Sequence, residues 1–175
     1  QSHTDDASTP LEATLEAFAK LVEQGKVRAI GASNYTAARL AEALDTSRRL
    51  GLPRYESLQP LYNLHDRAEF ERELQPLCVR EQVGVMNYYA LAAGFLTGKY
   101  RSPADAAKSA RGAGVVKKYL DERGLRILQA LDQAAQRTGA TPGQVAIAWL
   151  MGRAAVASPI ASATSLPQLQ DLVRA

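Results

Sequence analysis

Apolar positions along this chain alternate between two spacings, and the alternation predicts helices and strands in turn. Between Leu11 and Val22 apolar residues fall on one helical face, and Gly25 follows as a stop signal. A short apolar run over 27–32 then has the length and composition of a strand. Continuing this reading, we expect strands over 27–32, 55–59, 83–88 and 156–160, and helices over 10–25, 36–50, 68–82, 121–138, 141–151 and from 165 onward.

Two of these helices carry a start signal that is visible in the sequence. Thr9 precedes Pro10 and Glu12, which is the spacing of a capping box with proline at the first helical position. Thr141 and Gln144 have the same spacing. We therefore expect Thr9 and Thr141 to cap their helices.

Strands that alternate with helices over short connections indicate a parallel sheet covered by helices. An open doubly wound sheet and a closed barrel both fit this order. No strand is followed by a Gly-x-Gly-x-x-Gly motif, which disfavours the first. Polar or aromatic residues instead mark the carboxyl end of each strand, which favours a barrel with its chemistry at that rim. These residues are His3, Ser33 with Asn34, Gln59, Tyr88 and Ser162.

The composition is that of a globular protein, with 46% hydrophobic and 22% charged residues in 175. A net charge of +3, from 21 basic and 18 acidic residues, is too small to indicate nucleic-acid binding. Cys78 is the one cysteine, so no disulfide can form within the chain and a reduced thiol is expected. No apolar run is long enough to span a membrane and residues 1–10 are polar, so we expect a cytoplasmic protein. No metal site is predicted.

The segment over 84–100 carries the most information about function. An apolar strand ends at Tyr88 and runs into a glycine-rich loop that contains Lys99. An aromatic ring at a strand end can stack on a flat heterocycle, and glycines with a lysine let backbone and charge approach phosphate. The simpler interpretation is an aromatic core strand followed by an ordinary loop. Basic residues prevail from Lys99 to Lys118, where they form either a lid or a solvated loop.

Five motifs in order resemble the carboxy-terminal part of an aldo-keto reductase of the bacterial, potassium-channel-β-like branch. They are His3 with the segment 9–12, the segments 25–35 and 59–63, the segment 94–100, and the segment 159–163. The resemblance covers essentially all 175 residues. It implies a (β/α)8 TIM barrel, of which residues 1–175, without an internal domain boundary, supply roughly strands four or five to eight.

The resemblance also implies an NADP(H)-dependent oxidoreductase that reduces aldehydes or ketones by hydride transfer from nicotinamide. His3 matches the family's catalytic histidine, although it is also readable as a solvated terminal residue. The proton-donating tyrosine and its lysine and aspartate partners belong to strands outside this sequence. We therefore expect the chain alone to be inactive.

The remaining family positions fall along the cofactor. Ser33, Asn34 and Gln59 match partners of the nicotinamide carboxamide, and Tyr88 matches the residue that stacks on the ring. A simpler role at this point is to cap the following helix, which Asn34 or Thr36 can do. Positions around the pyrophosphate are Leu91, Ala93, Gly94, Leu96, Gly98 and Lys99; positions at the adenosine end are Ser162, Thr164, Gln168 and Asp171. Many relatives carry arginine at the place of Thr164 or Gln168, so the choice between NADPH and NADH stays open.

An alternative function is a non-catalytic nucleotide-binding barrel subunit, or a half-barrel that assembles with a partner. A barrel that lacks strands exposes unpaired backbone groups at its sheet edge, and such an edge favours association. Expected partners are a small carbonyl substrate and either the missing amino-terminal strands or a second copy of the chain. Neither nucleic acid nor a membrane is expected.

Overall fold

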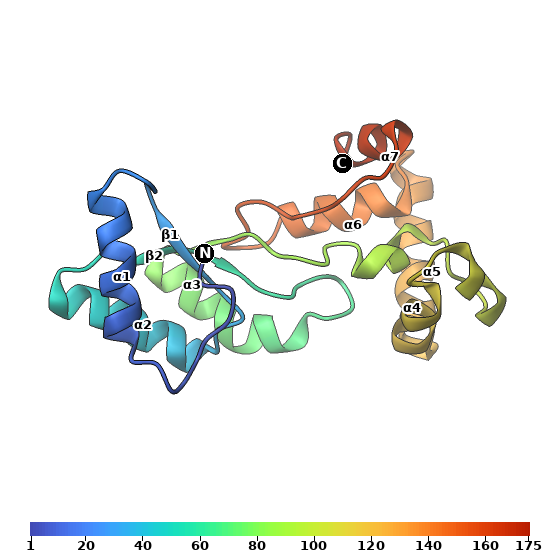
Figure 1. The fold of residues 1–175 in the computed structure, drawn as a ribbon. Coiled ribbons are helices and arrows are strands. Elements are labelled where there is room, and N and C mark those ends of the chain that lie inside the picture. Colours follow the sequence, from blue (N-terminus) through green and yellow to red (C-terminus); the bar gives the residue numbers. More distant parts are fainter. The chain divides into compact units, whose positions relative to one another are not determined.

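A computed structural model describes residues 1–175 (Figure 1). Helices and strands alternate in its first half, and helices dominate its second half. The elements are α1 (Leu11–Glu23), β1 (Ile30–Ser33), α2 (Ala37–Leu50), β2 (Tyr55–Gln59), the π-helix η1 (Phe70–Leu74), α3 (Gln75–Glu81), β3 (Gly84–Val85), the 3-10 helices η2 (Ala92–Thr97) and η3 (Pro103–Lys108), α4 (Gly112–Tyr119), α5 (Glu122–Thr138), α6 (Pro142–Met151) and α7 (Leu166–Leu172).

The chain divides into two compact units. Unit 1 consists of Gln1–Pro60 and Ala68–Met86, and unit 2 of Leu61–Arg67 and Asn87–Ala175. The short segment 61–67 thus belongs to unit 2 although unit 1 flanks it in sequence. The expectation of a chain without an internal domain boundary stays a prediction.

Unit 1 holds an open parallel sheet in the order β1-β2-β3. The amino terminus extends it, because Ser2 forms a parallel bridge with Ala32 at the outer edge of β1. The register shifts between Ile30 and Gly31, and a Cβ on Gly31 would overlap the Ser57 hydroxyl, so only glycine fits there. The chain therefore forms a parallel α/β segment, and its three-stranded sheet does not close into a barrel.

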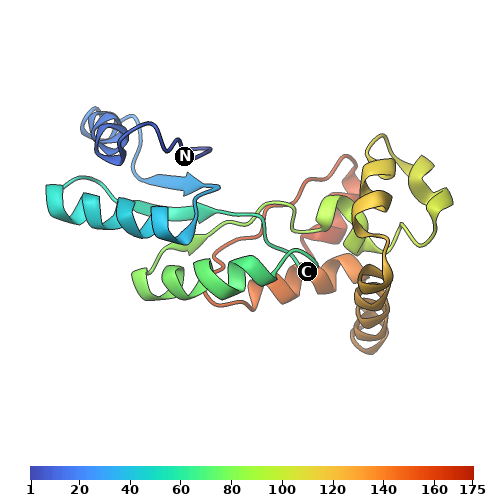
Figure 2. The same ribbon diagram turned by 90° about the horizontal axis from the view of Figure 1, so that it is seen from below.

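The helices α1, α2 and α3 run alongside this sheet, as the two views in Figures 1 and 2 show. Each places its apolar side inward: Leu15 of α1 and Leu40 of α2 are fully buried, as are Leu58 and Val85 of the strands. Burial of such side chains is the main stabilising contribution to a unit of this kind. The sheet is consequently fixed with its strand ends at one edge.

Unit 2 is built from the helices α4 to α7 and the loop that carries η2. Its core comprises Ala92, Phe95, Leu96, Tyr100, Val115, Tyr119, Leu128, Leu131 and Ala146. Three of these come from η2, so this short helix is an integral part of the unit's core.

Several sequence predictions are confirmed. The strand over 55–59 is β2, and Thr36 and Thr141 each accept a hydrogen bond from the backbone at the start of α2 and α6. Asp121 caps α5 in the same way, which the sequence analysis did not predict. The Thr141 capping box is complete. The prediction for Thr9 is wrong: its hydroxyl donates to Asp6, and α1 begins without a side-chain cap.

The helix expected over 68–82 is also confirmed, with a π-helical turn at Phe70–Leu74 just before Pro76, which lacks the N–H that an α-helical turn needs. Three other predictions of secondary structure are wrong. Of the strand expected over 83–88, the structure has only the two residues of β3. The segment 156–160 has no regular strand, and its strand-like contact within unit 2 is the Ile160 amide, which donates to the Asn87 carbonyl. Residues 103–119, expected as a loop, contain η3 and α4.

Candidate functional site

Four predicted site residues meet at the carboxyl edge of the sheet in unit 1. Ser33 and Gln59 are register partners at the ends of β1 and β2, and the Ser33 hydroxyl donates to the Gln59 main-chain oxygen at 2.7 Å. The Asn34 side chain donates to the main-chain oxygen of His3 at 2.9 Å and to the Ser33 hydroxyl at 3.2 Å. One continuous hydrogen-bond chain therefore links His3, Asn34, Ser33 and Gln59.

Within this group the side chains differ in what they can offer a ligand. Ser33 is 1% exposed and its hydroxyl hydrogen is already engaged, so its first role is to join two strand ends. Gln59 is half-buried, and its carboxamide makes no hydrogen bond within the chain. Asn34 has a positive φ of 55°, a conformation that asparagine tolerates and that turns its amide back over the strand ends. The imidazole of His3 is exposed.

Tyr88 lies in unit 2, where its backbone forms a parallel bridge with Leu61. Its ring lies edge-on to Tyr89, with ring centroids 5.5 Å apart. Burial, followed by the neighbouring Tyr89, raises the pKa of Tyr88 above that of a free tyrosine. Because the structure assigns Tyr88 to a different unit from the sheet edge, its convergence with Ser33, Asn34 and Gln59 stays a prediction.

The loop after Tyr88 has an unusual backbone. Ala92 and Ala93 have φ values of 49° and 55°, and Gly94 follows at 90°. Left-handed backbone at a residue other than glycine stores strain and is concentrated at functional sites. Leu91 precedes them with φ −103° and ψ 19°, and the amides of Ala92, Gly94 and Leu96 donate to the main-chain oxygens of Tyr89 and Leu91, so backbone hydrogen bonds within the turn hold its shape.

Lys99 lies over this loop. Its ammonium is 5.0 Å from the centroid of the Tyr100 ring, and a Cβ on Gly94 would lie 3.2 Å from the same nitrogen. The missing side chain of Gly94 therefore makes room for the lysine. Gly98, with φ 82°, ends η2, and Leu96 is buried beneath the loop. The predicted pyrophosphate positions thus form one turn with a cation at its surface.

The adenosine-end candidates reach the same loop through the start of α6. A Cβ on Gly143 would lie 3.6 Å from the Thr97 methyl carbon and 3.8 Å from an Asp171 carboxylate oxygen. Asp171 accepts hydrogen bonds from the Thr141 hydroxyl at 3.1 and 3.2 Å. Its carboxylate therefore holds α7 against the start of α6, a structural role that sequence reasoning did not assign to it.

The other residues of this end are also engaged locally. Gln168 accepts hydrogen bonds from the backbone amide of Thr164 at 2.8 Å and from its hydroxyl at 3.0 Å. Ser162 is exposed. These contacts order the turn before α7, and the contribution of the three residues to cofactor binding stays a prediction.

The basic residues after Lys99 are mostly paired. Arg101 forms a bidentate ion pair with Asp132, both bonds 2.7 Å, and Lys108 lies 2.7 Å from Asp105. Lys118 donates to Asp66 at 3.1 Å, so the interpretation of Lys118 as a merely solvated charge is wrong. These pairs belong to the folded structure of the segment, whether or not it also covers a ligand.

Sequence reasoning missed the polar residues of segment 61–67. The Asn63 side-chain oxygen accepts from the amides of His65 and Asp66 at 2.9 and 2.8 Å, and its nitrogen donates to the Tyr89 carbonyl at 3.1 Å. An Asn followed by Asp three residues later is the available signal, since asparagine frequently organises such turns. The segment is thereby fixed beside Tyr88 and Tyr89.

Residues 1–175 hold neither a cluster of metal ligands nor a helix that could span a membrane. No three histidine, cysteine or acidic side chains gather closely enough to hold a metal ion. None of the helices combines the length and the apolar character that crossing a bilayer demands. The cytoplasmic location stays a prediction.

Comparison with known proteins decides the family. Residues 1–175 match the family model described as the Aldo/keto reductase family. The chain belongs to this family. It is 33% identical to a probable voltage-gated potassium channel subunit beta of Arabidopsis thaliana, over 99% of this chain and 54% of that protein. It is also 33% identical to L-glyceraldehyde 3-phosphate reductase of Escherichia coli (strain K12), over 99% of this chain and 51% of the relative.

A third relative, protein tas of Escherichia coli (strain K12), is 35% identical over 97% of this chain and 49% of its own length. The chain therefore spans about half the length of these curated relatives. The resemblance to the potassium-channel-β-like branch is confirmed by the plant relative.

Proposed function

We propose that this chain is the cofactor-binding, carboxy-terminal part of an NADP(H)-dependent oxidoreductase that reduces aldehydes or ketones to alcohols. In that protein it supplies roughly strands four or five to eight of a (β/α)8 barrel. The observation that carries the proposal is the linked group of His3, Asn34, Ser33 and Gln59 at the carboxyl edge of a parallel sheet. Aldo/keto reductase membership supports it, and barrel enzymes place their chemistry at this edge.

At the nicotinamide end, the sheet edge offers the groups that a carboxamide needs. A carboxamide both donates and accepts hydrogen bonds, and the unpartnered Gln59 side chain provides both functions. Ser33 and Asn34 hold the two strand ends together and so fix the position of Gln59. Tyr88 provides an aromatic face for stacking on the nicotinamide ring.

At the phosphate end, the proposal assigns the diphosphate to the loop 91–99. Its turn is shaped by left-handed residues, and the Lys99 ammonium lies over Gly94. Charge-assisted hydrogen bonds from an ammonium to phosphate are roughly twice as strong as neutral ones. Lys99 is therefore the residue of this loop expected to contribute most to cofactor affinity.

The reduction requires a hydride donor and a proton donor. When bound, NADPH supplies the hydride. The proton donor needs a tyrosine whose pKa lies below the usual value of about 10. Burial instead raises the pKa of Tyr88, and it raises that of Tyr119 to about 12, so neither is suited to this role. These directions argue against Tyr88 and Tyr119 as the proton donor, a role that the proposal assigns to a tyrosine outside the chain, with His3 orienting the carbonyl group.

The test is an assay of NADPH oxidation with a generic aromatic aldehyde. It compares the 175-residue chain with a protein extended at its amino terminus to the length of its relatives. We expect both proteins to bind NADPH, and only the extended protein to oxidise NADPH with the aldehyde. Aldehyde reduction by the 175-residue chain would contradict a proton donor outside it. If neither protein binds NADPH or NADH, the proposed cofactor is wrong.

A second candidate is a nucleotide-binding subunit without catalysis. It is favoured by the Arabidopsis relative, whose name is that of a channel subunit. This candidate predicts that the extended protein binds NADPH and does not consume it with any carbonyl compound. The open edge of the three-stranded sheet further predicts association, so light scattering should give a mass above the 18.9 kDa of one chain. A stable monomer of that mass would contradict the association.

A further inference from the structure

Asp66 is the point in unit 2 at which several side chains meet. Its Oδ2 oxygen accepts hydrogen bonds from the Tyr119 hydroxyl at 2.8 Å and from the Lys118 ammonium at 3.1 Å. The Asn63 side-chain amide lies 3.3 Å from the same oxygen, and the His65 ring nitrogen Nδ1 lies 3.4 Å from the other. Burial alone would raise the pKa of Asp66, but these hydrogen bonds outweigh it and hold the pKa below the usual range. The carboxylate is therefore charged at neutral pH.

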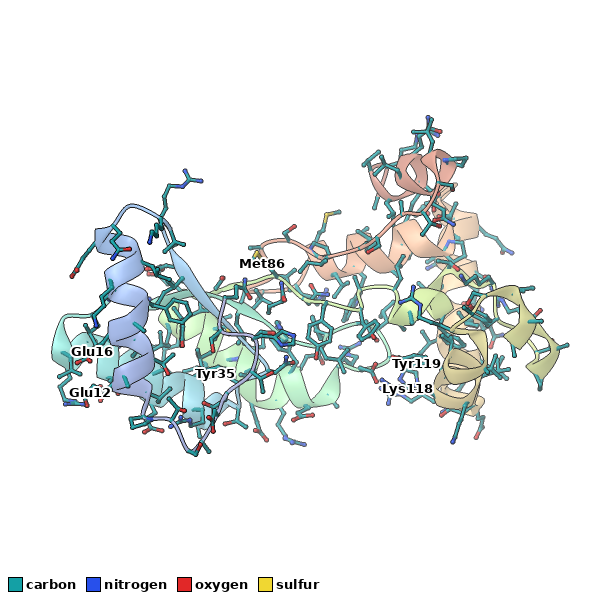
Figure 3. All side chains as sticks on the ribbon, in the orientation of Figure 1. Glu12, Glu16, Tyr35, Met86, Lys118 and Tyr119 are labelled. Atoms are coloured by element: carbon teal, nitrogen blue, oxygen red, sulfur yellow. The ribbon has the colours of Figure 1, made fainter.

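Tyr119 connects this carboxylate to the loop proposed to bind phosphate. It lies in the last turn of α4 beside Lys118 (Figure 3) and is 3% exposed. One face of its ring stacks on Phe95 of η2, with centroids 5.6 Å apart and planes 26° apart. The His65 ring meets it edge-on at 4.9 Å. The position of η2 is therefore coupled through Phe95 and Tyr119 to the hydrogen bond at Asp66.

The other side of Asp66 is coupled to Tyr88. The same turn that presents Asp66 is organised by Asn63, whose side chain also donates to the Tyr89 carbonyl at 3.1 Å. Lys118 and Asp66 are close enough to Tyr88 to influence its pKa in opposite directions. The Asp66 turn thus contacts the tyrosine pair on one side and, through Tyr119, the η2 loop on the other.

One detail separates this cluster from ordinary core packing. His65 is 9% exposed, and its Nε2 nitrogen is buried without a hydrogen-bond partner. Buried polar atoms normally have partners, and an exception asks for an explanation beyond stability.

We propose that the hydrogen bond between Tyr119 and Asp66 is a clasp that sets the spacing between Tyr88 and the η2 loop, and that both residues thereby position the two halves of the dinucleotide. The inference rests on the proposed function, because it takes Tyr88 and the η2 loop as the nicotinamide and phosphate contacts. Neither Asp66 nor Tyr119 needs to touch the cofactor. Both are positioning residues.

The test compares ligands that span the clasp with a ligand that does not. In the extended protein, Tyr119→Phe removes the hydroxyl and keeps the ring on Phe95 and His65. We expect this variant to bind NADPH about fivefold to tenfold more weakly, the size of one lost hydrogen bond. Adenosine 2′,5′-bisphosphate, which lacks the nicotinamide half, should bind within about twofold of the wild type, because one side of the clasp suffices for it. A merely structural role would weaken both ligands alike.

Tyr55→Phe is the matched control. Tyr55 is a fully buried tyrosine in unit 1 whose hydroxyl lies 3.2 Å from that of Tyr35, so the substitution removes a comparable group. It should leave the ratio of the two affinities unchanged. Asp66→Asn should lower NADPH affinity in the same direction, and the double variant with Tyr119→Phe should lose less than the sum of the two effects.

The outcomes separate the clasp from the function on which it rests. If the wild type binds neither NADPH nor NADH, the proposed function fails. If it binds NADPH and Tyr119→Phe binds both ligands as the wild type does, the clasp is wrong and the function stands. Equal weakening of both ligands, or full additivity of Asp66→Asn and Tyr119→Phe, would also overturn the clasp.

Discussion

Substitution of Gly94 by alanine tests whether the space at Gly94 lets the Lys99 ammonium bind phosphate. Gly94 has φ 90°, and the added Cβ would lie 3.1 and 3.2 Å from the last two atoms of the Lys99 side chain. Those atoms are the far end of a flexible chain, so the ammonium moves aside with little loss of folding free energy. The loss comes from the backbone, since left-handed alanine costs about 1–2 kcal/mol.

Gly139→Ala is the control for this backbone cost. Gly139 has φ 72°, and a Cβ there would meet nothing within 4 Å. Both variants should therefore lower the free energy of unfolding in urea by a similar amount, about 1–2 kcal/mol. Only Gly94→Ala should displace Lys99 and remove one charge-assisted hydrogen bond to phosphate, a loss of about 1.5–3 kcal/mol or tenfold and more in Kd.

The assay is a fluorescence titration of NADPH with the extended protein, accompanied by urea unfolding of each variant. If Lys99 binds phosphate in the space at Gly94, Gly94→Ala and Gly139→Ala should be equally stable, and Gly94→Ala should bind NADPH more weakly. Similar NADPH affinities for the two variants would show that Lys99 makes no phosphate contact that depends on the space at Gly94. Lys99→Met should reproduce the affinity loss without the loss of stability.

Three further outcomes are expected. Ser33→Ala removes the 2.7 Å hydrogen bond to Gln59 and should lower the unfolding free energy in urea by about 1 kcal/mol and weaken NADPH binding; unchanged affinity would exclude a positioning role. Gly124→Ala places a Cβ on the Tyr119 carbonyl and should lower the thermal midpoint, with an overpacking cost of about 1–3 kcal/mol, and an unchanged midpoint would contradict this packing. Burial raises the pKa of Cys78 from 9.0 to about 11, so the stability conferred by the neutral thiol is present below pH 9 and lost as pH rises through 11. A thiol reagent near pH 8 should label Cys78 slowly in the folded chain and rapidly in urea, and rapid labelling of the folded chain would show that the thiol is accessible.

Local signals made part of the fold predictable. The boundaries of β2 and the caps at Thr36 and Thr141 follow from a few neighbouring residues, and the structure has them where the sequence predicts them. Thr9 carries the same local signal but fails, because Asp6 offers its hydroxyl a carboxylate acceptor. A capping pattern describes what a side chain can do, and a nearby competing acceptor decides what it does.

The polar strand ends were also predictable, since parallel strands bring their carboxyl ends to one edge. The group at Ser33 and Gln59 is the direct result. The link between Asp66 and Tyr119 was not predictable in this way. The two residues are 53 positions apart, and the hydrogen bond depends on α4, whose glycines at 112 and 114 are typical of a loop. Such contacts are set by tertiary packing, which single-sequence patterns do not encode.

We propose that Ser33, Asn34, Gln59 and Tyr88 surround one nicotinamide ring. A crystal structure of the amino-terminally extended protein with NADP+ would show the position of that ring. We expect the ring to lie against Tyr88, with its carboxamide bonded to the ends of β1 and β2. A nicotinamide bound elsewhere, or Tyr88 packed against apolar side chains with no room beside its ring, would contradict it.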